Sequence, residues 1–140
     1  MTAHVTALTT AFMSALAGAA QVVERVRLRP LPESTSTAIV VRPTRVVVQE
    51  TDMLGASVET LTAIQVECYA RASGATAPDQ ALDPLLTEVQ QRLLADPTLG
   101  GQIAWLTVAG AELEFDAELR DLACATVTFT ARHRPVGYPL

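Results

Sequence analysis

The spacing of apolar residues predicts two amphipathic helices. The first lies within residues 1–20. The second is expected to start with Asp83 as its N-cap and Pro84 at the first helical position, and to end at Pro97. Their apolar stripes comprise, in chain order, Val5, Leu8, Phe12, Ala15, Leu16 and Ala19, then Leu82, Leu85, Leu86, Val89 and Leu93. Each helix is therefore expected to bury one face against a core.

Apolar and polar residues alternate with period two elsewhere, which predicts strands. These segments are residues 22–29, 38–50, 58–72, 103–110, 111–118 and 119–134. Pro43 lacks a ladder donor, so we expect a bulge, a break or a sheet edge there. The order of helix, strands, helix and strands predicts an α+β fold. We expect a mainly antiparallel β-sheet with two principal helices packed on one face.

Composition and length limit the class of protein. The chain has 140 residues and 49% are hydrophobic, which predicts one domain over residues 1–140 with a loose C-terminal tail at 135–140. Residues 1–20 lack the basic start of a secretion signal, so an amphipathic helix is the better interpretation. No apolar window approaches the length of a membrane span.

The charge balance argues against nucleic acid as a partner. The net charge is −5, and all ten basic residues are arginine. An acidic chain is a poor nucleic-acid binder on global electrostatics, although a local arginine patch can bind an acidic surface. The two cysteines, Cys68 and Cys124, lie far apart without CxxC spacing, so we expect two thiols and no zinc site, with a disulfide left open.

The stretch "ADPTLGGQIAWL" (residues 95–106) contains two glycines. A phosphate-binding loop places its glycines before a helix, where amide groups point at the anion. Here Gly100 and Gly101 follow a helix and precede a strand, so they face the negative end of the helix dipole. We therefore expect a helix stop.

Catalytic motifs are absent from the sequence. It contains no GxSxG, no HExxH and no EF-hand loop, and His4 and His133 lie near opposite ends of the chain. We expect no catalytic residues, no cofactor and no metal. The chain is predicted not to be an enzyme.

Two charged stripes of opposite sign are the strongest candidate interface. They comprise Arg25, Arg27 and Arg29 in one predicted strand, and Glu112, Glu114 and Asp116 in another. If the two strands are neighbours, the stripes pair across the sheet within one subunit. If the strands lie at different edges, the stripes can meet between identical subunits, and such head-to-tail contacts close a ring when the rotation permits. A solvated strand face is the simplest alternative.

Several segments together resemble one viral family. These are "IVVRPTRVVVQE", "LTAIQVECYARAS", "LLADPTLGG" before a strand, and the final "LACATVTFTARHR". Spanning roughly Ala38 to Arg134, they resemble the tail terminator (minor tail protein U-like) family of long-tailed bacteriophages. The resemblance implies a structural virion protein. Family members form hexameric rings that cap the tail tube, end its elongation and join the tail to the head's neck.

The resemblance also implies partners and a location. The partners are other copies of the chain, the major tail tube protein and a neck or head-completion protein, with no membrane involved. The location is the head-proximal end of the tail in the virion, and the host cytoplasm before assembly. Residues 50–58 form a predicted loop, and we hypothesise that Met53 and Leu54 contact the tube or a neighbouring subunit. An ordinary hairpin tip is the alternative.

Two other functions remain open from the sequence. The first is a head-completion or neck connector protein of similar size. The second is a small α+β enzyme or ligand-binding domain, which requires polar residues that converge in a pocket.

Overall fold

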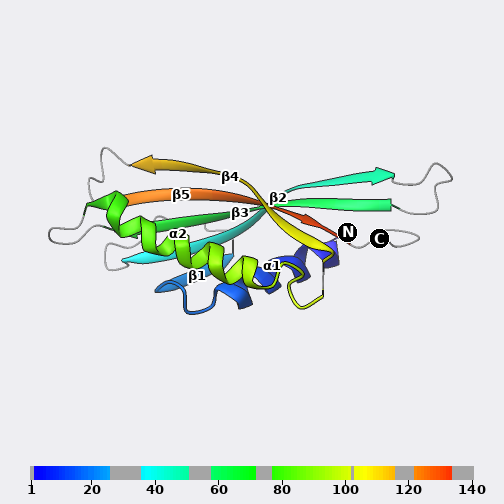
Figure 1. The fold of residues 1–140 in the computed structure, drawn as a ribbon, viewed down its shortest axis with the longest axis horizontal. Helices are drawn as coiled ribbons and strands as arrows, with labels where there is room; N and C mark the ends of the chain where they lie inside the picture. The colour runs from blue at the N-terminus through cyan, green and yellow to red at the C-terminus, as the bar shows by residue number, and fades with distance from the viewer. Residues whose placement is uncertain are drawn as a thin grey trace.

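The computed structural model describes residues 2–25, 36–50, 58–71, 77–101, 103–115 and 122–133 (Figure 1). Its elements are, in chain order, α1 (Thr2–Leu16), β1 (Val22–Arg25), β2 (Thr37–Glu50), β3 (Val58–Arg71), α2 (Pro78–Ala95), β4 (Trp105–Phe115) and β5 (Leu122–Arg132). Arg27, Arg29, Met53, Leu54, Asp116 and the tail 135–140 lie outside these described residues.

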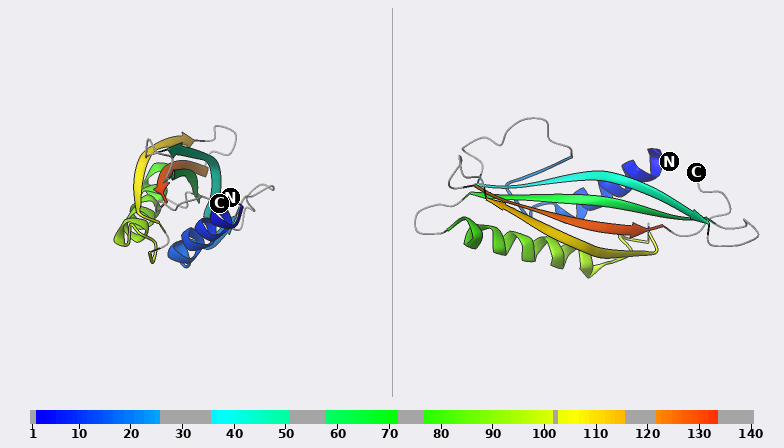
Figure 2. Two further views of the ribbon diagram at one scale, coloured as in Figure 1. Left: turned by 90° about the vertical axis from the view of Figure 1, so that its right-hand side faces the viewer. Right: turned by 90° about the horizontal axis from the view of Figure 1, so that it is seen from above.

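The five strands form one sheet in the order β1-β2-β3-β5-β4. Strands β1 and β2 are parallel, whereas the other three pairs are antiparallel. The sheet arches over the two helices (Figure 2, left), with α1 packed on β1 and β2, and α2 packed on β3 and β5. The predicted α+β fold, with a mainly antiparallel sheet and both helices on one face, is confirmed.

Burial alternates along the central strands as their sequence predicts. In β5 every second residue from Ala123 to Ala131 is buried, and in β3 the same holds from Thr60 to Ala70. These side chains face the helices, and we call this side of the sheet the inner face. The opposite side, the outer face, carries mostly polar residues, which include Gln65, Glu67, Tyr69, Thr126 and Thr128.

Helix α1 covers one half of the inner face. It buries Leu8, Phe12 and Leu16, which lie on the predicted apolar stripe. The Phe12 ring meets the Phe129 ring of β5 edge to face, with 5.8 Å between the ring centroids. The amphipathic helix expected within residues 1–20 is confirmed, and it ends at Leu16.

Helix α2 starts earlier than the sequence predicts. Pro78 occupies the first turn, and the side-chain oxygen of Gln80 accepts a hydrogen bond of 3.1 Å from the Ala77 amide. Asp83 is therefore not the N-cap, and Pro84 lies inside the helix. The additional turn buries Leu82, and this burial stabilises the fold by about 1.5–3 kcal/mol. The gain offsets much of the ~3 kcal/mol by which a proline inside a helix, here Pro84, destabilises it.

Bulges interrupt two strands. The β2–β3 register shifts between Pro43 and Arg45, as expected from the missing proline donor. The β4–β5 register shifts between Val108 and Gly110, so the segments predicted separately at 103–110 and 111–118 contribute to one bulged strand, β4. A bulge keeps a strand continuous while it bends and twists more strongly.

Strands β2 and β3 continue beyond the end of β5 as a two-stranded arm. The last β3–β5 pair joins Leu61 to Arg132, whereas β2 and β3 stay paired as far as Glu50 and Val58. The arm projects at one end of the long axis (Figure 1, right). Within the described part of the chain, no helix is long and apolar enough to span a membrane.

Candidate functional site

The described residues of the two charged stripes lie on opposite edges of the sheet. Arg25 ends β1, the first strand in the sheet order, and Glu112 and Glu114 belong to β4, the last. Three strands separate them, so the stripes do not pair across neighbouring strands of one subunit. This topology excludes pairing within one subunit for the described residues and leaves contact between copies or a solvated strand face.

Only parts of each stripe are described. The Arg25 guanidinium is exposed and donates a hydrogen bond to the Thr10 hydroxyl of α1, which fixes its side chain at the β1 edge. On β4, Glu112 and Glu114 are exposed. The β4–β5 register pairs Glu112 with Thr126 and Glu114 with Cys124. Because Thr126 and Cys124 point to the outer face, the two carboxylates point to the outer face as well.

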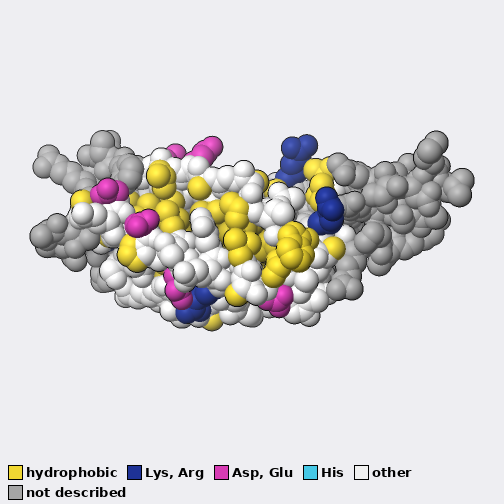
Figure 3. Space-filling model, viewed as in Figure 1, with side chains coloured by type: hydrophobic (Ala, Val, Ile, Leu, Met, Phe, Trp, Pro, Cys, Tyr) yellow, Lys and Arg dark blue, Asp and Glu magenta, His cyan; other side chains and the backbone are white. Residues whose placement is uncertain are grey.

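The β4 edge is apolar as well as acidic. Trp105 is 53% exposed, Leu113 56% and Val108 40%. Hydrophobic side chains gather in a band across the face seen in Figure 3, and charged groups of both signs lie around it. Long exposed edge strands with apolar side chains are sites where another chain readily pairs. Among the described strands, none lies beyond β4.

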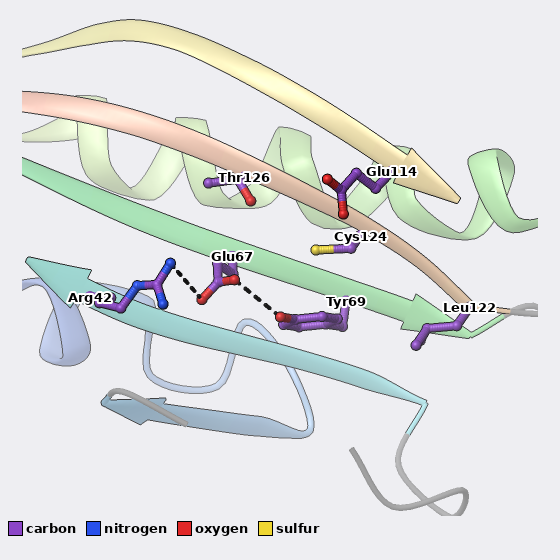
Figure 4. Close-up of a pocket in the computed structure, with 7 residues that line it drawn as sticks. All are labelled: Arg42, Glu67, Tyr69, Glu114, Leu122, Cys124 and Thr126. Carbon is purple, nitrogen blue, oxygen red and sulfur yellow. Dashed lines mark hydrogen bonds and ion pairs between the residues drawn. The ribbon is translucent and has the colours of Figure 1, made fainter. Parts of the chain in front are cut away.

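The outer face contains a hollow of about 580 Å³ (Figure 4). Its lining comprises Arg42, Glu67, Tyr69, Glu114, Leu122, Cys124 and Thr126. The Tyr69 hydroxyl donates to Glu67 Oε2 at 3.2 Å, and an Arg42 guanidinium nitrogen lies 3.9 Å from Glu67 Oε1. The same guanidinium donates to Gln65 Oε1 at 3.2 Å. Glu67 is thus held between a phenol and a guanidinium.

The surroundings of the hollow disfavour ionisation of its phenol and its thiol. Burial is the main cause that raises the pKa of the Tyr69 hydroxyl, with Cys124 and Glu67 adding to it, and burial with Glu67 and Glu114 raises the pKa of the Cys124 thiol. A thiol nucleophile needs a lowered pKa, because the thiolate is the reactive form. The hollow therefore suits polar contact with another surface better than nucleophilic chemistry. Among the described residues, no group of three or more His, Cys, Asp or Glu side chains is placed to hold a metal ion.

The two cysteines are free thiols. Cys68 is buried on the inner face, where burial raises its pKa to about 12, and Cys124 is half-buried on the outer face. They belong to neighbouring strands, but Cys68 is paired with Ala125 and Cys124 with Tyr69. Because side chains of a register pair point to the same face, the two thiols point to opposite faces. The disulfide that the sequence leaves open is thereby excluded.

The glycine turn is a helix stop, as expected. Helix α2 ends at Ala95, and Leu99, Gly100 and Gly101 all adopt positive φ. The Gly100 amide donates to Asp96 Oδ2 at 2.8 Å, and the Gly101 amide donates to the Thr98 carbonyl at 3.1 Å. Both glycine amides thus have acceptors within the turn itself.

Asp96 should make this turn sensitive to acid. Hydrogen bonds from the Thr98 hydroxyl and from the Gly100 and Thr98 amides lower the pKa of the Asp96 carboxyl. Because the pKa of Asp96 is lower in the folded protein than in the unfolded chain, its carboxylate stabilises the folded state at pH values above the ordinary aspartate pKa. This stabilisation is lost as the pH falls through the pKa of Asp96 in the folded protein. We expect Asp96→Asn to show a shallower loss of melting temperature with falling pH than the wild type. Parallel acid-induced curves for both proteins would contradict this role.

The sequence identified the edge carboxylates but not the hollow. The alternation within residues 58–72 predicts that Gln65, Glu67, Tyr69 and Arg71 share one face of a strand. Their neighbours Arg42 and Cys124 come from β2 and β5, and only the register brings them there. Alternation within a single strand carries no information on which strand lies next to it.

Comparisons with known proteins add a likeness of fold. No protein-family model matches the chain, and no curated protein matches it. One similar solved chain belongs to a structure described as the virion of a native gene transfer agent particle. The identity is 13%, the match covers 86% of this chain and 82% of that chain, and the TM-score is 0.56.

Another similar chain belongs to a structure of the sheath/tube terminator of an extracellular contractile injection system in the extended state. Its identity is 12%, its TM-score is 0.42, and the match covers 95% of this chain but 59% of that one. At such identities a likeness concerns fold alone. The chain therefore shares its fold with a component of the gene transfer agent virion.

Proposed function

We propose that this protein is a structural subunit of a virus-like tail. In this proposal it forms a ring of identical copies, six by resemblance, that caps the tail tube and ends its elongation. The ring then joins the tail to a neck or head-completion protein. The observation that carries the proposal is the fold shared with a virion component over 86% of the chain.

The charge and topology of the sheet support self-association. Each copy presents Arg25 at one edge and Glu112 and Glu114 at the other. A contact between unlike edges is head to tail, and repetition of one such contact produces a closed ring or an open filament. Exposed ion pairs each contribute about 0–1 kcal/mol, so the pairs set the register while apolar burial by Trp105, Val108 and Leu113 supplies most of the affinity.

Met53 and Leu54 remain a proposed contact. They belong to the segment that links Glu50 to Val58 at the end of the two-stranded arm, outside the described residues. The described arm projects at one end of the long axis of the molecule (Figure 2, right), a position that suits contact with a tube or a neighbouring subunit.

Reversal of the arginine stripe should weaken self-association. The triple variant Arg25→Glu, Arg27→Glu and Arg29→Glu makes the edge that attracts the acidic β4 edge less positive, and added salt should weaken the wild type in the same direction. Sedimentation equilibrium at low and high salt measures both effects. If neither the variant nor the salt changes the association constant, the stripe is a solvated face.

The tail role itself is tested in particle assembly. When tails assemble without this chain, we expect tubes of uncontrolled length that remain separate from heads, as seen by electron microscopy. Added purified protein should restore a defined length. Tubes of normal length that join heads without it would remove the proposed function.

A further inference from the structure

The described part of β2 has an edge that the sheet leaves open. Strand β1 pairs with β2 only from Ala38 to Val41, so the stretch from Arg42 to Glu50 has no described strand on that side. This stretch is nine of the fourteen residues of β2 and includes the β2 strand of the two-stranded arm. It carries the exposed arginines Arg42 and Arg45.

The open stretch of β2 and the edge of β4 complement each other in charge. Along β4, the described charged residues are Glu112 and Glu114, and along the open stretch of β2 those with described side chains are Arg42 and Arg45. Register pairs Arg42 with Gln65, Arg45 with Ala63, and Glu112 with Thr126. All four charged side chains therefore point to the outer face, where they can meet if the two edges come together.

The bulge in β2 makes the spacings match. Arg42 and Arg45 are three residues apart in the sequence, whereas Glu112 and Glu114 are two apart. The register shift between Pro43 and Arg45 places one additional residue in β2, so Arg42 and Arg45 oppose Gln65 and Ala63, which are two positions apart on β3. On the ladder, the two arginines are thus spaced like the two carboxylates.

We propose that β4 of one copy pairs antiparallel with the open stretch of β2 in the next copy, with Glu112 opposite Arg45 and Glu114 opposite Arg42. The pairing ends at Glu114, because the next position of β2, Val41, is already paired with Arg25 of β1. The sheet then continues from subunit to subunit. This proposal deepens the ring function above and rests on it, because the partner is a second copy. It assigns the acceptor edge to β2 and not to the arginine stripe that begins in β1.

The inner-face side chains fit the same register. When Glu112 lies opposite Arg45, Ala111 lies opposite Val46, and both of these side chains point to the inner face. Ala111 is exposed and Val46 is half-buried, so the pairing would cover a small and a β-branched side chain without an unpaired charge between them.

Charge-swap variants test the assigned pair. Arg45→Glu and Glu112→Arg should each weaken self-association about 5- to 10-fold, as expected when one partly exposed attraction becomes a repulsion. The double variant should return to within about 2-fold of the wild type. Arg25→Glu is the matched control, and its defect should not be rescued by Glu112→Arg. Rescue of Arg25→Glu in place of Arg45→Glu would overturn the β2 assignment and leave the ring proposal intact.

Disulfide trapping provides a second, independent readout. In a Cys124→Ser background, the pair Arg45→Cys with Glu112→Cys should give linked oligomers on oxidation. The pair Val46→Cys with Glu112→Cys should not, because its side chains point to opposite faces. Equal linking in both pairs, or none while the wild type associates, overturns the register. A wild type that stays monomeric at every concentration and fails to restore tail length overturns both proposals.

Discussion

Phe129→Ala is expected to lower the free energy of unfolding by about 3–5 kcal/mol, the usual cost when a buried aromatic ring is removed from a core. The Phe129 side chain is fully buried in β5, the strand between β3 and β4. Its ring contacts the Phe12 ring of α1 edge to face. The residue therefore joins the sheet to the helix, and neighbouring side chains on a sheet cannot easily collapse into the vacated space. Urea denaturation monitored by circular dichroism measures the change.

The ring pair can be separated from simple burial by a double-mutant cycle. Phe12→Ala should be destabilising by a similar amount, and the double variant should lose less than the sum of the two, because the edge-to-face pair is worth about 0.5–1.5 kcal/mol beyond its area. Strict additivity would mean that the rings pack independently. A loss below about 1 kcal/mol for Phe129→Ala would contradict its place in the core.

Leu93→Ala is expected to destabilise the protein by about 2–5 kcal/mol, and Leu94→Ala by less than about 1 kcal/mol. The two residues are adjacent in α2, but Leu93 is fully buried whereas Leu94 is 41% exposed. The same substitution in the same helix turn removes the same atoms and changes helix propensity equally. The difference between the variants therefore measures burial alone.

Thermal and urea unfolding of both leucine variants, at concentrations where the wild type is monomeric, gives this difference. Equal losses would show that the α2 face is not the one that packs on the sheet. A large loss for Leu94→Ala that appears only at concentrations where the wild type associates would place Leu94 in a contact between copies.

The local pattern of apolar and polar residues was sufficient to predict which side chains of the central strands and of the helices are buried. In β5, alanines and bulky residues alternate with threonines, so the buried face from Ala123 to Ala131 follows directly from the order of residues. Leu8, Phe12 and Leu16 recur at helical spacing and are all buried. In both cases one element's own period decides which side chains meet the core, and neighbours do not alter it.

The start of α2 was mispredicted because two local signals competed. Asp83 and Pro84 form a good N-cap and first position, but Pro78 offers the same first-turn preference one turn and a half earlier. Burial of Leu82 against the sheet favours the longer helix. Such tertiary burial is not visible in the sequence of the helix itself.

The order of the strands in the sheet could not be predicted from the sequence. Nothing in the residues of β1 or β4 states that they lie at opposite edges, and the hollow around Glu67 and Cys124 exists only because β2, β3 and β5 are neighbours. The parallel pairing of β1 with β2 likewise does not follow from the alternation within either strand. These features follow from the packing of whole elements.

The native mass of the purified protein, measured alone and after mixing with tail tubes, tests the central claim that this chain functions by contact between copies. One copy has a mass of 14.9 kDa. Association at tube ends should give particles whose added mass is a whole multiple of that value, and the double charge swap should preserve it. A protein that remains a single copy in both conditions, and leaves tube ends bare, would contradict the account.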